Sequence, residues 1–198
     1  STAIPYNNVS AIYFGHTIDH IPEKNLSNVL NRFHESMKVG GVLRIVTPDA
    51  DLIYNAYSQK DISYFRPYKS WFAVRGEPNP SLEDYLVQII ATPKSRIYTA
   101  RDNSLFKVDH TEVKSAFSNK GKIDFLNWLI SGLDDNNTSG TDHLNFFNHS
   151  KLKEIAEDHG FEYQKSAFGQ SKSLPMREIP LFDETVPFVS MYADLIKI

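Results

Sequence analysis

Apolar and polar residues in the first 49 positions alternate with the spacing of strands and of a helix. Residues 9–15 (VSAIYFG) form a short apolar run that ends at a glycine, which predicts a buried strand. Gly40-Gly41 is expected to end the next element, a helix, and 42–47 to form a second strand before Pro48-Asp49. The helix is predicted because apolar side chains recur at intervals of three and four residues: Leu26, Val29, Leu30, Phe33 and Met37. Together these elements predict a right-handed parallel βαβ unit.

Regular spacing returns near the C-terminus. Residues 148–160 begin with Asn and Ser, carry an apolar face and end in glycine, which predicts a helix. Two further strands are predicted at 161–168 and 188–198. The proline-containing stretch between them, 169–187, is expected to be a loop.

The middle of the chain has a different character. Helical spacing is confined there to 50–58, 82–91 and 122–133, and Pro- and aromatic-rich segments separate these patches. A connection this long between strands is typical of an inserted cap. We therefore expect one domain over residues 1–198, with a mainly helical insertion at about 50–140 that ends in the polar tract DDNNTSGTD.

Composition narrows the class of protein. The chain has 198 residues, of which 41% are hydrophobic, and a net charge of −3. Because phosphate binding needs a clustered basic field, nucleic acid is not expected as a partner. No apolar run approaches the roughly 20 residues that span a bilayer, and the first residues lack the features of a signal peptide. Without cysteine there are no disulfides or thiolate metal sites. We expect a cytoplasmic protein that does not bind membranes.

Two segments also carry a family resemblance. Residues 13–22 read YFGHTIDHIP, and residues 37–49 read MKVGGVLRIVTPD. Both resemble motifs at the fourth and fifth strands of class I S-adenosylmethionine-dependent methyltransferases, in a branch often encoded beside sugar and cell-envelope genes. Two departures are mild, since Asp19 stands where the family has Glu, and Val39 where it has Pro. 

The tail of the chain agrees with this resemblance. Residues 143–161 are similar to the segment that precedes the family's sixth strand, and residues 190–197 to its last strand. Residues 1–8 stand where the family has a linker before its fourth strand. The middle of the chain matches nothing in the family.

The resemblance implies an α/β fold, built on a partial Rossmann-like methyltransferase sheet. Its four strands would correspond to strands four to seven of the family, in the order 4-5-7-6 across the sheet, with the last strand antiparallel. The strand at 9–15 would then have an unpaired edge, which promotes pairing. We expect this edge to be covered, either by a second copy in a homodimer or by the insertion.

A cofactor and a function are implied as well. Family members transfer a methyl group from S-adenosylmethionine, and the matching cofactor-lining residues are Phe14, Gly15, His16, Asp19 and His20. The family's Gly-rich turn, which lets the backbone approach the cofactor, has no match in this chain. The chain is therefore expected to be methyltransferase-like: a natural truncation, a fragment, or a relative that lost cofactor binding. It is expected to be inactive unless it still binds the cofactor. Its acceptor is unknown, with a small molecule or sugar expected. The alternative is a non-catalytic interaction or scaffold module derived from the same fold.

Two polar residues are weak candidates for catalysis. His16 could act as a general base, or it could cap the following helix. Asp49 could orient an acceptor nucleophile, or it could N-cap a helix that starts near Asp51. In both cases we favour the structural interpretation.

Three other groups of residues are expected to be structural. The histidines His110, His143 and His149, with Asp109 and Asp142, lack the spacing of a metal site, so no metal is expected. Aromatic and basic side chains alternate between positions 64 and 75, where they could bind sugars, bases or acidic groups, but a small core of their own is favoured: Tyr64, Phe65, Arg66, Tyr68, Lys69, Trp71, Phe72 and Arg75. The helical spacing of Phe125, Trp128 and Leu129 predicts core packing.

Overall fold

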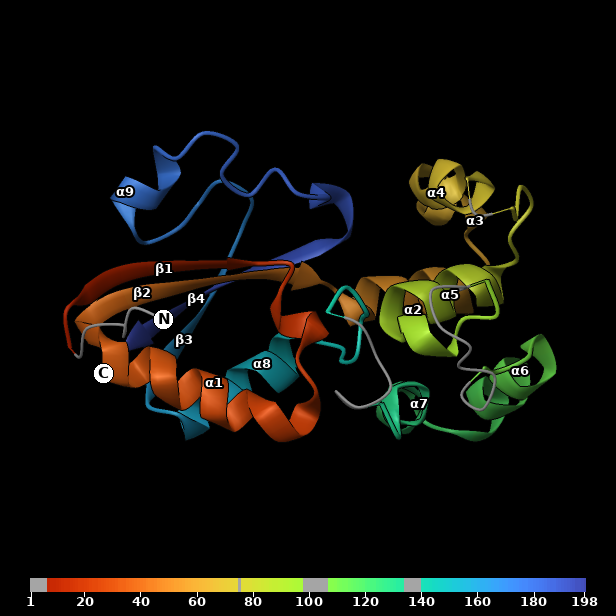
Figure 1. Cartoon of the computed structure of the whole chain (residues 1–198), viewed down its shortest axis with the longest axis horizontal. Helices are drawn as coiled ribbons and strands as arrows, with labels where there is room; N and C mark the ends of the chain where they lie inside the picture. The colour runs from red at the N-terminus through yellow and green to blue at the C-terminus, as the bar shows by residue number, and fades with distance from the viewer. Residues whose placement is uncertain (1–6, 75, 98–106, 134–139) are drawn as a thin grey trace. The chain divides into compact units, whose positions relative to one another are not determined.

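The computed structural model describes residues 7–74, 76–97, 107–133 and 140–198 (Figure 1). Arg75, residues 1–6 of the linker match and residues 134–139 of the polar tract lie outside the described residues. The chain divides into two compact units. The first, here the sheet unit, comprises Ser1–Asp49 and Phe147–Ile198, and the second, here the helical unit, comprises Ala50–Phe146.

An open mixed sheet of four strands forms the sheet unit. The strands are β1 (Val9–Gly15), β2 (Met37–Pro48), β3 (Phe161–Ser166) and β4 (Ser190–Lys197), in the order β1-β2-β4-β3. β1 pairs with β2 in parallel, and β4 is antiparallel to both β2 and β3. The predicted α/β class, the four strands and the reversed direction of the last one are therefore confirmed.

Two helices cover one face of this sheet. Figure 1 shows α1 (Glu23–Ser36) and α8 (His149–Asp158) on one side and the segment that carries the short helix α9 (Leu174–Arg177) on the other. Leu43 and Ile45 of β2 pack in the core beneath the helices, so the strand period of two turns Arg44 toward the opposite face. This core contains Ile18, Leu26, Leu30, Met37, Leu43, Ile45, Phe147, Leu152, Ala156, Phe161, Met191, Ala193 and Leu195.

The predicted end of the first helix is wrong. α1 ends at Ser36, and β2 already begins at Met37, whose backbone is extended and whose side chain is fully buried. The pairing of β1 with β2 is irregular here, because Val9 pairs with Met37 whereas Ala11 pairs with Val42. Gly40 takes a φ of +75° in this irregular stretch, and a Cβ on Gly41 would lie 2.8 Å from the Lys38 carbonyl oxygen. The glycines therefore serve a bulge between strands rather than a helix end.

The helical unit contains three predicted helices. These are α2 (Ala50–Ser58), α5 (Leu82–Ile90) and α7 (Lys122–Ile130). Phe125 and Leu129 are fully buried in the core of this unit, and Trp128 packs against it, as predicted. Shorter elements also belong to this unit: α3 (Ile62–Phe65), α4 (Lys69–Ala73) and the 3-10 turns η2 (Arg66–Tyr68) and η3 (Thr92–Lys94).

Helix α6 (His110–Asn119) was not among the predicted elements. It begins with a capping box, in which the Asp109 side chain accepts from the Glu112 N–H and the Glu112 side chain accepts from the Asp109 N–H.

The predicted loop 169–187 in the sheet unit contains a helix that was not predicted, α9. A 3-10 turn, η4 (Pro187–Val189), leads into β4, so this strand starts two residues later than predicted. No helix among the described residues is long and apolar enough to cross a membrane.

Candidate functional site

The carboxyl ends of the three parallel strands meet at one edge of the sheet. Gly15 pairs with Val46, and Val46 and Ser166 both pair with Tyr192, so β1, β2 and β3 end at the same level. Ligands of open α/β sheets bind outside this edge. The structure places there the predicted site residues of the first strand and of the second, namely Phe14, Gly15, His16, Asp19, His20 and Asp49.

His16 fastens the end of β1 to the segment before β4. Its backbone N–H donates to the Val46 carbonyl oxygen (2.7 Å), which continues the sheet for one more residue. Its ring Nε2 lies 3.0 Å from the Thr185 carbonyl oxygen and 2.9 Å from Ser190 Oγ. Because the Ser190 hydroxyl donates to the Val186 carbonyl oxygen (2.8 Å), Nε2 is the donor in both contacts. A nitrogen that carries the proton cannot act as a base, so the geometry gives Nε2 an anchoring role.

Unusual backbone conformations gather in the segment that His16 binds. Leu181, Asp183 and Val186 have φ values of +63°, +62° and +45°, and His16 itself has +46°. Positive φ is uncommon for residues other than glycine, and for a β-branched residue such as Val186 it signals strain. Strain of this kind costs of order 1–3 kcal/mol per residue and concentrates at functional places. The segment from 181 to 186 is thus held in shape by its contacts rather than by its own preference.

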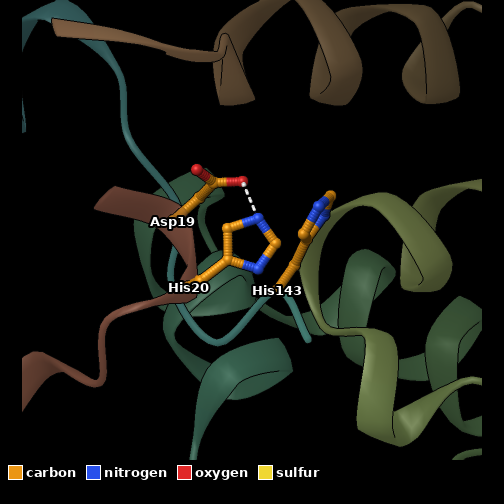
Figure 2. A group of neighbouring side chains, drawn as sticks. All are labelled: Asp19, His20 and His143. Atoms are coloured by element: carbon orange, nitrogen blue, oxygen red, sulfur yellow. Dashed lines mark ion pairs between the residues drawn. The ribbon is translucent and has the colours of Figure 1, made fainter. Parts of the chain in front are cut away.

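Asp19 and His20 follow β1 in the 3-10 turn η1 (Ile18–His20). The Asp19 carboxylate is 2% exposed and lies 3.6 Å from His20 Nε2, an ion pair when that imidazole is protonated (Figure 2). His143, drawn in the same picture, belongs to the helical unit and is described with it below. The turn therefore presents a buried carboxylate whose neighbouring imidazole is partly exposed.

Phe14 and Gly15 differ in what they can offer a ligand. The Phe14 ring packs edge-on against Phe33 of α1 at 5.1 Å, so its side chain belongs to the core. A Cβ on Gly15 would lie 2.7–2.9 Å from the Tyr13 ring, so this position offers only backbone. Of the predicted cofactor-lining residues, these two could contribute main-chain groups alone.

Asp49 follows β2 at the same edge. Its backbone N–H donates to the Val189 carbonyl oxygen (2.8 Å), and it forms an isolated bridge with Phe147. Asp49 directly precedes α2, which begins at Ala50, where the predicted helical patch at 50–58 also begins. Burial, and secondarily the charge of Asp49, raises the pKa of Tyr163 to about 12, and the Tyr163 hydroxyl lies 2.5 Å from His149 Nδ1. Near neutral pH this tyrosine is therefore protonated.

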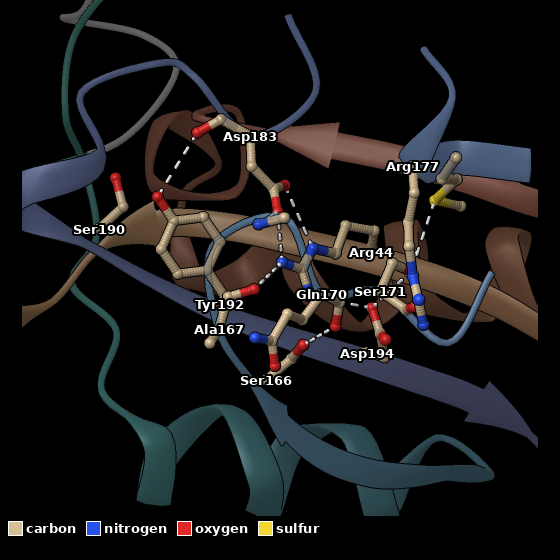
Figure 3. Close-up of polar contacts among 12 residues, drawn as sticks. Arg44, Ser166, Ala167, Gln170, Ser171, Arg177, Asp183, Ser190, Tyr192 and Asp194 are labelled. Carbon is tan, nitrogen blue, oxygen red and sulfur yellow. Dashed lines mark hydrogen bonds and ion pairs between the residues drawn. The ribbon is translucent and has the colours of Figure 1, made fainter. Parts of the chain in front are cut away.

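A buried charged cluster that was not predicted from the sequence lies on the face of the sheet opposite the helices (Figure 3). Arg44 of β2 is fully buried, and its guanidinium donates to both oxygens of Asp183, with Nη2 2.5 Å from Oδ2 and Nε 3.3 Å from Oδ1. Nη1 donates to Asp194 (3.2 Å), and Nη2 also donates to the Ala167 carbonyl oxygen (2.8 Å). One guanidinium thus joins two fully buried carboxylates that are distant in the sequence.

The Asp183 and Asp194 carboxylates also accept hydrogen bonds from the segment between β3 and β4. Asp194 accepts from Ser171 Oγ (3.1 Å) and the Lys172 N–H (2.5 Å), and Asp183 accepts from the Gly169 N–H (2.9 Å). The guanidinium also lies 5.2 Å from the centre of the Tyr192 ring. These contacts hold the segment between β3 and β4 over the sheet. A signal existed in the sequence, because Arg44 interrupts the apolar run VLRIV and Asp194 interrupts YADLI.

His110, His143 and His149, for which no metal site is predicted, each have a different partner. His110 Nε2 lies 2.9 Å from Asp84, His143 Nδ1 donates to the Ile89 carbonyl oxygen (2.6 Å), and His149 contacts Tyr163. Within the described residues of either unit taken by itself, no three His, Asp or Glu side chains lie close enough to share a metal ion.

The aromatic segment between positions 64 and 75 contributes to the core of the helical unit. Phe65 and Phe72 are fully buried against Tyr85, with ring centroids 5.3 and 4.7 Å away. The favoured interpretation as a small core holds for these two rings. Tyr68 and Trp71 are only partly buried and pack at its margin.

Comparison with known proteins gives no family. No protein-family model matches the chain, and no curated protein matches it.

Proposed function

We propose that the sheet unit corresponds to strands four to seven of a class I S-adenosylmethionine-dependent methyltransferase, and that the protein is methyltransferase-like. The observation that carries this proposal is the sheet order β1-β2-β4-β3, in which only β4 is reversed. A final antiparallel strand inserted between the second and third parallel strands is the arrangement that the sequence resemblance implies. The order supports the proposal because β4 could instead have added to the outer edge of β3.

In this proposal the chain supplies part of a cofactor site. S-adenosylmethionine, when bound, provides an electrophilic methyl group that an acceptor displaces in line, so the protein's contribution is chiefly positioning. The Gly15 backbone and the turn that carries Asp19 and His20 would line one wall of the site. The Gly40-Gly41 pair lies in β2 and does not open a helix, so it cannot act as the Gly-rich turn. His16 and Ser190 would hold that wall in place through their mutual hydrogen bond.

A non-catalytic interaction module is the second candidate. Two observations favour it: the His16 Nε2 proton is used to anchor the Thr185 carbonyl, and β1 pairs only with β2 among the described strands. An edge strand presents unpaired backbone groups to another chain. In this version the strand β1 would pair with β1 of a second copy.

Calorimetric titration with S-adenosylhomocysteine separates the two candidates. The methyltransferase-like proposal expects saturable binding that Asp19→Asn weakens, because the buried carboxylate lies in the proposed wall. Asp158→Asn, an exposed change at the end of α8, is the matched control and should leave binding unchanged. A folded protein that releases no heat contradicts the proposal, and a dimer in sedimentation equilibrium would then support the interaction module.

A further inference from the structure

The helical unit contains a cavity of about 300 Å³ beside the last turns of α5. Three aromatic side chains form much of its wall, namely Tyr68, Trp71 and Phe72. Ile89, Gln88 and Thr92 line it from α5 and the turn that follows, and Thr141 and His143 from the returning chain. This volume lies at the lower end of the range for cavities that bind small molecules.

Gln88 is the polar group that sets this cavity apart from a packing defect. The side chain belongs to a helix that is buried from Glu83 to Ile90, and the residue is only 6% exposed. Its amide oxygen Oε1 is buried and has no hydrogen-bond partner among the described residues. An unsatisfied buried acceptor destabilises the folded state, so a core position of this kind normally carries an apolar residue. A ligand that donates a hydrogen bond to Oε1 would remove this cost.

The wall beside Gln88 is held in place by its own hydrogen bonds. The Thr92 hydroxyl donates to the Gln88 carbonyl oxygen (3.1 Å) and accepts from the His143 N–H (3.2 Å). The His143 ring donates from Nδ1 to the Ile89 carbonyl oxygen (2.6 Å). These bonds fasten the returning chain to the end of α5. The Gln88 amide is therefore presented from a rigid element, as a preorganised binding group should be.

The lining residues also define the chemistry of a ligand. None of the described residues that line the cavity is Asp, Glu, Lys or Arg, so its ligand is neutral. Aromatic faces bind the apolar face of a ring, while the amide binds a polar edge. The Trp71 and Phe72 rings meet at 71°, so they do not form the parallel slot that a flat heterocycle would require. A puckered ring with hydroxyl donors fits these walls better.

We propose that this cavity is a binding site for a neutral pyranose sugar, stacked on the aromatic wall and donating a hydroxyl hydrogen bond to Gln88. The site lies wholly within the helical unit, and the proposal does not depend on methyltransferase activity. A single ring fills a cavity of this size, so the ligand is a monosaccharide or one residue of a longer chain.

Tryptophan fluorescence tests the proposal directly, because the chain has only two tryptophans. In a Trp128→Phe background, Trp71 is the sole reporter and lines the cavity. The probes are methyl glucopyranoside and N-acetylglucosamine, with glucuronate as the charged counterpart and adenosine as the flat heterocycle. We expect a saturable change in Trp71 emission with at least one neutral pyranose, and at least about tenfold weaker binding of glucuronate, whose charge would be buried without a partner.

Gln88→Met separates ligand binding from a structural role. It keeps the volume of the side chain and removes the unsatisfied acceptor, so the sugar should bind at least about tenfold more weakly while the midpoint of thermal unfolding stays the same or rises. Gln59→Met, at an exposed position outside the cavity, is the matched control and should change neither quantity. Three results would overturn the proposal: no saturable change with either neutral sugar, a response to adenosine alone, or equal affinity in Gln88→Met.

Discussion

Replacing Arg44 should destabilise the sheet unit more than any surface substitution. Arg44→Met keeps an apolar chain of similar reach but removes four hydrogen bonds to Asp183, Asp194 and the Ala167 carbonyl. Two fully buried carboxylates then lose their shared cation. Breaking a buried pair in this way costs about 3–5 kcal/mol. Because the Gly169 and Lys172 N–H groups and the Ser171 hydroxyl still donate to the carboxylates, we expect the lower end, about 3 kcal/mol.

Urea denaturation followed by circular dichroism measures this loss. Arg32→Met, at an exposed position of α1, is the matched control and should change the free energy of unfolding by less than about 0.5 kcal/mol. Arg44→Lys should fall between the two, since a single ammonium cannot bind both oxygens of Asp183 as the guanidinium does. Neutralising the carboxylates in Arg44→Met with Asp183→Asn and Asp194→Asn should recover at least about 1 kcal/mol.

Amide hydrogen exchange adds a local readout. In Arg44→Met, protection should fall first at the Gly169 and Lys172 N–H groups, which bond to the two carboxylates. A cost below about 1 kcal/mol, or a loss of protection spread evenly over the sheet, would refute the argument that this cluster holds the segment between β3 and β4.

Three further predictions concern pH and backbone strain. Burial acts to raise the pKa of Asp84, but hydrogen bonds from Arg96, His110 and Ser81 outweigh it and lower the pKa from 3.8 to about 2. The folded state should therefore lose about 2 kcal/mol of stability, present above pH 4, as the pH falls from 4 to 2. Asp84→Asn should abolish this pH dependence in acid titrations. Burial lowers the pKa of Lys94 from 10.5 to about 8, so the unfolded state binds more protons than the folded state between these pH values. The free energy of unfolding should therefore rise by about 3 kcal/mol from pH 8 to 10.5. A Lys94→Met variant should lack this rise in urea titrations. His16 has a φ of +46°, and both His16→Gly and His16→Ala remove its ring contacts. Because glycine adopts positive φ without strain, His16→Gly should be about 1 kcal/mol more stable than His16→Ala in thermal unfolding. Equal stabilities of the two variants would argue against backbone strain at this position.

Local patterning in the sequence was sufficient for the main elements. The apolar run at 9–15 and the spacing of Leu26, Leu30 and Phe33 predict β1 and α1, because burial of one face imposes these periods. The pattern could not separate Met37 from the helix, since an apolar residue fits the buried face of a helix and of a strand alike. Its extended conformation depends on pairing with Val9, a contact that the local sequence does not specify.

The candidate site was predictable only in part. The position of His16 after the first strand follows from topology, because the carboxyl ends of parallel strands share an edge. Its hydrogen bonds to Thr185 and Ser190 span about 170 residues of chain and leave no local pattern. The same holds for the pairing of Arg44 with Asp194, although each is a charged residue in an apolar strand. Two such interruptions of opposite sign are a signal that buried strands are joined by a charge pair.

The most direct test of the methyltransferase-like proposal is a two-dimensional ¹⁵N–¹H NMR titration of the chain with S-adenosylhomocysteine. The account predicts chemical-shift changes concentrated at Gly15 to His20 and at Thr47 to Asp49, the edge where the parallel strands end. Saturating ligand that shifts no resonance of this edge, or only resonances of the helical unit, would contradict it.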